Sequence, residues 1–129
     1  MDRCPCCNAR LREVAICPRC KADLSAIIDA EQSAQFWLSK AVHYCLESKT
    51  EQSIAALDLS LCLNKTRVAN VFRDFLIHQQ SRDILDLLAK KQLLAAKQQL
   101  YRVRELLSYS KQLRKLDNLT DYLLIKDQQ

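Results

Sequence analysis

Among the residue types of this chain, the cysteines have the number and spacing expected of a chemical or metal-binding site. The stretch CPCCNARLREVAICPRC, residues 4–20, holds five of the seven cysteines of the 129-residue chain. It contains two C-x-x-C pairs, each opening with Cys-Pro, with nine residues between them. Four thiolates on two such tight turns can surround one ion tetrahedrally at about 2.3 Å, which is the closed arrangement of structural zinc. The sequence therefore predicts one metal ion bound by Cys4, Cys7, Cys17 and Cys20.

Other uses of closely spaced thiols fit the sequence less well. No apolar segment follows the charge in MDRCPCC, and no apolar run approaches the roughly 20 residues of a membrane span. We therefore expect a cytoplasmic protein, in which disulfides are rare. A redox pair would open a helix beside a βαβ unit, and a haem attachment would need histidine at Asn8 or Lys21. Zinc is preferred over iron for the four sulfurs, although iron could occupy the same site, and Cys6 is expected to point away from it.

The cysteine stretch resembles a known family. CPCCNARLREVAICPRCKADL is similar to the short zinc ribbon of many bacterial proteins, whose knuckles have the geometry that rubredoxin uses for iron. The likeness covers residues 3 to about 25 and includes Leu11 and Leu24, one after each knuckle. The family usually has glycine after each second cysteine, where this chain has Asn8 and Lys21. The resemblance implies a structural, non-catalytic ion, with strain in the second knuckle because lysine tolerates the left-handed conformation poorly.

The remaining composition indicates helices. Glycine is absent, so the chain cannot form a P-loop or a dinucleotide-binding fingerprint. Leucine, alanine, glutamine, lysine and arginine are frequent, and all five favour helix. His43 and His78 lie far apart without an acidic partner in a motif, so we do not expect an enzyme. The expected fold class is mostly α, with a zinc ribbon over residues 1–25 and an α-helical, repeat-like domain over residues 26–129.

Apolar spacing predicts two helices after the ribbon. Ser33 is expected to cap a helix that ends near Glu47, and Thr50 to cap a second helix through Leu63. A third helix is expected near residues 66–79, and Cys45 and Cys62 are expected to be buried apolar side chains.

The first two of these helices resemble a tetratricopeptide repeat. WLSKAVHY keeps the aromatic positions of that family at Trp37 and Tyr44, with Ala41 at its glycine and Lys40 at its leucine. In SIAAL, Ser53 stands at the family's alanine. Ala41 and Ser53 are therefore both small residues, as in the family, and allow the two helices to pack closely. The resemblance covers roughly residues 34–67 and implies a concave face that binds a segment of another protein.

A long helix, straight or bent, is predicted from a cap at Ser81 to about Leu116. It carries nine basic and three acidic residues, whereas residues 26–64 carry two basic and five acidic ones. A seam of a/d type is formed by Leu93, Ala96, Leu100, Val103 and Leu107. One flank of the seam is basic, with residues spaced seven apart: Lys90, Lys97, Arg104 and Lys111. Three interpretations are open: the seam packs on the chain's own acidic first helices, binds an acidic partner, or binds phosphate.

The sequence thus favours a non-catalytic adaptor, scaffold or assembly factor with one structural zinc ion. Its expected partner is another protein with an acidic or amphipathic segment. The alternative is a small nucleic-acid-binding regulator that uses the basic ribbon and the basic flank of residues 90–115, although no groove-reading motif is present. The C-terminal stretch NLTDYLLIKDQQ is expected to be either the last packing helix or a short binding motif.

Overall fold

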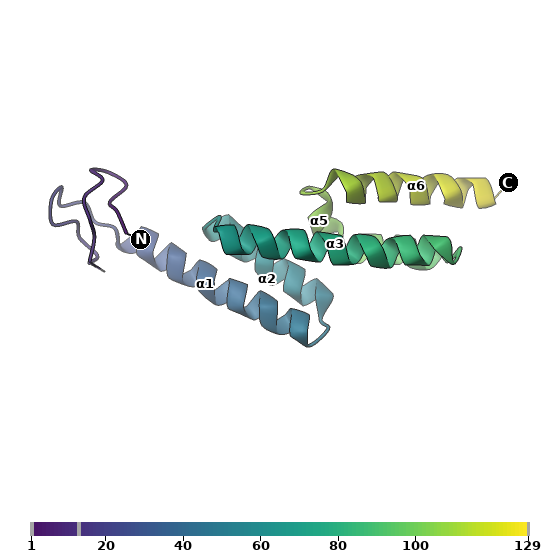
Figure 1. The fold of residues 1–129 in the computed structure, drawn as a ribbon, viewed down its shortest axis with the longest axis horizontal. Helices are drawn as coiled ribbons and strands as arrows, with labels where there is room; N and C mark the ends of the chain where they lie inside the picture. Colours follow the sequence, from purple (N-terminus) through teal and green to yellow (C-terminus); the bar gives the residue numbers. More distant parts are fainter. Residues whose placement is uncertain (1, 13, 129) are drawn as a thin grey trace.

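Helices account for most of the chain in the computed structural model, which describes residues 2–12 and 14–128. They are α1 (Ser25–Leu46), α2 (Thr50–Leu63), α3 (Arg67–Ala89), α4 (Leu93–Arg102), α5 (Arg104–Leu107) and α6 (Lys111–Asp127). The described residues include no strand, only two isolated bridges in the cysteine-rich segment. This segment lies at one end of the elongated molecule and the C-terminus at the other (Figure 1). The predicted mostly-α fold class is confirmed.

α1 and α2 form a hairpin in which the two backbones lie close together. Small residues make this approach possible, since Ala34, Ala41, Ser53 and Ser60 are all buried. The hydroxyl of Ser53 donates to the carbonyl of Ala41 and that of Ser60 to the carbonyl of Ala34, each at 2.7 Å. The predicted small positions Ala41 and Ser53 therefore do pack at the contact, and each buried serine hydroxyl finds an acceptor in the backbone of α1.

The predicted start of the first helix was wrong. α1 begins at Ser25, directly after the ribbon, and Ser33 lies exposed within it. Asp23 accepts bonds from the hydroxyl of Ser25 at 2.6 Å and from its backbone N–H at 3.0 Å, and these bonds lower the pKa of Asp23. The carboxylate thus stabilises the N-terminus of a helix that begins eight residues before the expected cap at Ser33. The second helix ends at Leu63 as predicted, and Thr50 is its first residue rather than its cap.

The single long helix predicted from Ser81 does not form. Thr66 caps α3, its hydroxyl accepting the N–H of Ala69 at 3.1 Å, and α3 then runs through Ser81 to Ala89. Lys91 adopts a left-handed conformation with φ of 59°, and the N–H groups of residues 91 and 92 bond back to the carbonyls of residues 88 and 87. This is the Schellman arrangement that ends a helix. Ser110 then starts α6 as an extended N-cap, accepting the N–H of Leu113 at 3.3 Å.

The predicted seam is largely buried, but its packing partners differ from those expected. Ala96, Leu100 and Val103 belong to the main hydrophobic core, which Leu107 joins as a half-buried residue. α4 packs mainly on α3 and α6, α5 packs on α2, and Nε of Arg102 at the end of α4 lies 3.6 Å from a carboxylate oxygen of Glu51 in α2. Packing on the acidic first helices, one of the three interpretations of the seam, therefore holds for α5 and the end of α4, whereas most of α4 packs on later helices. The turn at Lys91 is the reason, because it folds α4 back against the helix that precedes it.

Three smaller expectations are decided by the fold. Cys45 is half-buried against the core as expected, but Cys62 is exposed. Residues 118–127 of the C-terminal stretch form the second half of α6, which packs on the domain through one face: Thr120 is buried, whereas Leu119, Tyr122 and Ile125 are exposed. No helix in the described part of the chain has the length and apolarity that crossing a membrane requires.

The small residues of the α1–α2 contact lead to a stability prediction. We expect Ala41→Leu to destabilise the helical domain by about 1–3 kcal/mol, because it overpacks the contact and separates the Ser53 hydroxyl from its acceptor. Urea unfolding followed by circular dichroism measures the change. The matched control is Ala55→Leu, at an exposed alanine of α2, which should change stability little. Equal losses for both variants would show that the contact is not tightly packed.

Candidate metal centre

The first knuckle is a tight turn whose backbone closes on itself. The N–H of Asn8 donates to the carbonyl of Cys4 at 2.8 Å, and the N–H of Cys4 donates to the carbonyl of Ala9 at 2.9 Å. An isolated antiparallel bridge joins Arg3 and Arg10 on either side of the turn. These bonds hold Cys4 and Cys7 on one side of a short loop.

The second knuckle repeats the same bonds. The N–H of Lys21 donates to the carbonyl of Cys17 at 2.9 Å, and the N–H of Cys17 donates to that of Ala22 at 3.0 Å. The bridge between Ile16 and Asp23 corresponds to the one beside the first knuckle. The two halves of the ribbon therefore place their cysteine pairs by one repeated backbone geometry.

Left-handed residues end both knuckles. Asn8 and Lys21 each have φ of 62°, at the positions where the resembled family usually has glycine. This conformation lets the following residues turn back to bond with the first cysteine of each pair. A non-glycine residue in this region costs roughly 1–2 kcal/mol, more for lysine than for asparagine. Each knuckle thus carries a local strain that other interactions of the ribbon must offset.

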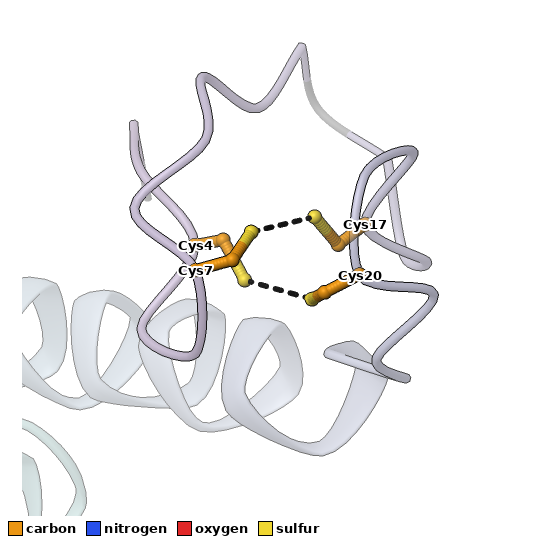
Figure 2. Close-up of side chains that lie close together, drawn as sticks. All are labelled: Cys4, Cys7, Cys17 and Cys20. Carbon is orange, nitrogen blue, oxygen red and sulfur yellow. Dashed lines mark hydrogen bonds between the residues drawn. The ribbon is translucent and has the colours of Figure 1, made fainter.

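The four predicted sulfurs converge on one point, as Figure 2 shows. Sγ of Cys4 lies 3.6 Å from that of Cys20, and Sγ of Cys7 lies 3.6 Å from that of Cys17. All four sulfurs lie within 4.8 Å of one another. A tetrahedron of sulfurs about 2.3 Å from a central ion has edges of about 3.8 Å. The donor set and its spacing therefore fit one zinc or iron ion.

Backbone N–H groups favour the thiolate form at two of the sulfurs. The pKa of Cys17 is lowered to about 6, mainly by the N–H of Cys20. Burial opposes ionisation of Cys4, but the N–H groups of Cys7 and Cys6 outweigh it and lower its pKa. The N–H of Ala22 donates to Cys20, yet burial and the neighbouring sulfurs outweigh it and raise that pKa to about 12. Four thiolates this close repel one another, and a divalent cation is the group that would balance their charge.

The site has the character of a closed structural centre. Four protein thiolates fill a tetrahedral coordination shell, so neither water nor substrate would have a position on the ion. Cys6 is exposed and lies outside the group of four. Leu24 is buried with Cys4 and Cys17, and Leu11 and Ile28 pack against them. This small cluster shares no residue with the core of the helical domain.

The predicted partner-binding residues do not form one flank. Lys90 follows α3, Lys97 lies in α4, Arg104 in α5 and Lys111 in α6, because the turns that break the predicted helix separate them. Lys90 pairs with Asp86 at 3.8 Å. Arg104 lies over the ring of its neighbour Tyr101, 4.4 Å from the ring centroid. Lys111 is exposed at the start of α6.

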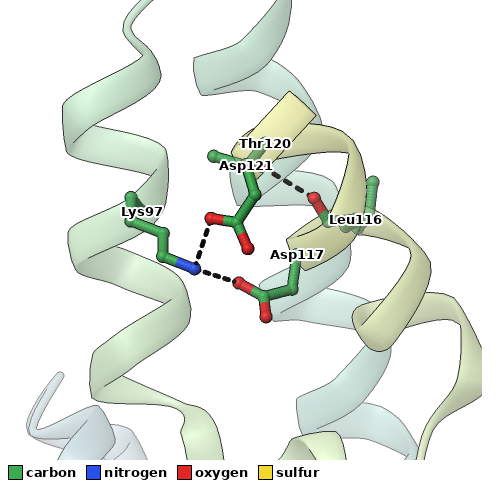
Figure 3. A network of polar contacts seen from close by, with 5 residues as sticks. All are labelled: Lys97, Leu116, Asp117, Thr120 and Asp121. Carbon is green, nitrogen blue, oxygen red and sulfur yellow. Dashed lines mark hydrogen bonds and ion pairs between the residues drawn. The ribbon is translucent and has the colours of Figure 1, made fainter. Parts of the chain in front are cut away.

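Lys97 has a structural role that the sequence did not indicate. Its Nζ lies 2.7 Å from carboxylate oxygens of both Asp117 and Asp121, and so joins α4 to α6 (Figure 3). Hydrogen bonds to Asp117 and then to Asp121 are the largest causes that raise the pKa of Lys97. The spacing of the two aspartates, four residues apart on one helix, was a usable signal, but only the fold shows which lysine they meet.

Comparisons of the chain with known protein families, with curated proteins and with solved structures find no match. The likeness to zinc ribbons thus depends on the cysteine pattern and its geometry.

The first prediction for this site concerns the ligands. Purified protein should contain one metal ion per chain, and Cys17→Ser should abolish binding because three sulfurs leave the shell incomplete. Cys6→Ser should leave the metal content unchanged, which makes it the matched control. Elemental analysis measures both. Loss of metal in Cys6→Ser, or its absence from carefully purified wild type, would contradict the assignment.

A second prediction follows from the two separate apolar clusters. Chelation should unfold the ribbon, because its own cluster is too small to hold it, and leave the helical core folded. Hydrogen exchange should then show lost protection at residues 4–24 and retained protection in α2 to α6. Deprotection spread evenly over the helices would show instead that ribbon and helical domain unfold as one unit.

Proposed function

We propose that this protein is a non-catalytic, cytoplasmic zinc-ribbon adaptor whose helical domain binds an acidic, amphipathic segment of another protein. The closed sulfur site supports the non-catalytic part, since it offers no open coordination position. We further propose that the α1–α2 hairpin is a tetratricopeptide-like unit, on the strength of its aromatic positions and its buried small residues. The partner surface that we propose is the outer face of α6.

The outer face of α6 combines positive charge with exposed apolar side chains. Leu119, Tyr122 and Ile125 are 44%, 60% and 61% exposed. Around them lie four exposed basic residues of the same helix: Lys111, Arg114, Lys115 and Lys126. This face is the observation on which the proposal rests.

The internal ion pairs explain why this face is positive. α6 contains three aspartates, and two of them, Asp117 and Asp121, bind Lys97 on the side that packs against α4. Both carboxylates are therefore drawn toward Lys97, although Asp121 stays 48% exposed, and Asp127 lies at the helix end. An amphipathic helix with acidic flanks would bury its apolar stripe on Tyr122 and Ile125 and place its carboxylates near the lysines.

The alternative function, nucleic-acid binding, draws on the same charges. The exposed arginines of the ribbon and the basic part of residues 90–115 could contact phosphates. However, Lys97 is held by two carboxylates, and Arg104 lies over its own tyrosine. The exposed apolar residues on α6 also have no role in phosphate contact. We therefore favour a protein partner.

The test is affinity capture with the metal-loaded full chain from its native cells, followed by cross-linking and mass spectrometry. We expect cross-links from the partner to Lys115 and Lys126, and at least a tenfold loss of the captured protein with Tyr122→Glu, as for a central interface residue. The matched control is Leu94→Glu, which changes a 72% exposed leucine on α4 and should retain the partner. Equal capture by both variants would contradict the proposed surface.

Salt dependence separates the two functions. A nucleic-acid binder loses roughly 0.9 log units of affinity per neutralised phosphate for each tenfold increase in salt. We expect only weak binding of random-sequence DNA and RNA by the wild type. Submicromolar binding near physiological salt that weakens steeply as salt is raised would overturn the adaptor proposal.

A further inference from the structure

An open apolar groove lies between α1 and α3. Its volume is about 650 Å³, and its apolar lining consists of Leu38, Val42, Val68, Val71, Phe72 and Phe75. The α3 side is strongly exposed, with Val68, Val71 and Phe75 at 67%, 60% and 53%. α3 lies at the front of the molecule in Figure 1, and α1 runs beside the part of it that carries this groove. An apolar patch of this kind on a helix face is typical of an interaction surface.

The α3 side of the groove has the spacing of a helix-pairing seam. Val68, Val71 and Phe75 are separated by three and four residues, so they form one stripe along the helix. Phe72 stacks on Phe75, with ring centroids 6.2 Å apart, and packs against the core of the domain. α1 thus bounds the stripe on one flank and leaves the other flank open.

The open flank carries two opposite charges. Arg67 precedes Val68 and Asp74 precedes Phe75, so the two lie seven residues apart, on the side of the stripe away from Phe72. Arg67 is exposed and has no ion-pair partner within residues 2–12 and 14–128. The side chain of Asp74 is 70% exposed and has only the adjacent Arg73 nearby, at 3.4 Å. Arg73 in turn lies over the ring of Tyr109.

This charge pattern is complementary to itself when the helix is reversed. In an antiparallel pair of copies related by a two-fold axis, the start of one stripe meets the end of the other. Arg67 of each copy then lies beside Asp74 of its partner, which gives two equivalent ion pairs around the valines and phenylalanines. In a parallel two-fold pair this flank would instead face the partner's Phe72 flank, and neither Arg67 nor Asp74 would gain an ion-pair partner. We infer that the groove binds a second copy of this chain through an antiparallel, isologous contact of α3 with α3.

This inference goes beyond the proposed adaptor function, because it uses α3 and α1 whereas the adaptor uses α6. It is tested first by the oligomeric state of the metal-loaded full chain, from sedimentation equilibrium over a range of concentrations. We expect a concentration-dependent dimer, and a dissociation constant at least tenfold higher for Val71→Glu, as for a buried interface residue. Leu94→Glu is the matched control for adding a carboxylate at an exposed apolar residue, and should dimerise as the wild type does. The inference would be overturned by a wild type that stays monomeric at every concentration, or by a Leu94→Glu variant whose dimer is weakened as much as that of Val71→Glu.

Charge reversal tests the orientation. Arg67→Asp and Asp74→Arg should each weaken the dimer, because each variant places like charges together twice. Mixing the two variants should produce a heterodimer tighter than either homodimer, since both contacts then join opposite charges, one as in the wild type and one with reversed signs. Native mass spectrometry of the mixture measures this directly. A mixture that contains the three dimers in statistical proportion, or assemblies larger than dimers, would overturn the antiparallel contact.

Discussion

The convergence of four cysteine sulfurs on one point is the constraint on which the N-terminal ribbon depends. The buried residues of its apolar cluster are Cys4, Cys17 and Leu24, so two of the three are themselves proposed ligands. Its backbone bonds lie within the two halves, where the N–H of Leu11 donates to Asp2 and that of Leu24 to Ala15, and among the described residues none of them joins one knuckle to the other. A segment of this size cannot offset its conformational entropy with so little buried surface. The left-handed Lys21 increases that cost, and an ion bound by the four sulfurs would supply the difference.

The absence of glycine imposes a second constraint, because tight turns still have to be made. Within residues 2–12 and 14–128, four non-glycine residues lie in the left-handed region: Asn8, Lys21, Ser48 and Lys91. Two of these end knuckles and two end helices, and in each case the N–H of the left-handed residue bonds back to a carbonyl of the preceding turn, while the next residue completes a second bond, through its carbonyl in the knuckles and through its N–H at the helix ends. Each turn is therefore stabilised by the bonds it completes, which offsets a conformational cost of roughly 1–2 kcal/mol per residue.

This constraint also explains what could be predicted from the sequence. The ligand set was predictable, because the C-x-x-C spacing fixes where the thiols can lie, and Asn8 and Lys21 replace glycines of a known pattern. No comparable pattern surrounds Lys91, and the apolar spacing of three and four residues continues across the turn. The sequence therefore predicted one continuous helix where the structure has a turn. Ser33 and Ser81 are good N-caps by residue type, yet both lie inside helices, because Asp23 and Thr66 stabilise earlier starts. Periodicity predicted helix content well, whereas helix ends depended on bonds that only the fold reveals.

The fold keeps its two proposed binding surfaces on different helices. α6 packs on α3, α4 and α5, whereas the groove is formed by α3 and α1. A dimer formed through α3 would leave the outer face of α6 free in both copies. The ribbon continues directly into α1, and Ile28 packs against its cluster, so each ribbon is held in a defined direction from the dimer contact. Two weak α6 surfaces on one dimer would bind a partner with two acidic segments far more tightly than either surface alone. Self-association of the inferred kind would therefore strengthen adaptor function without any change in the surface that binds the partner.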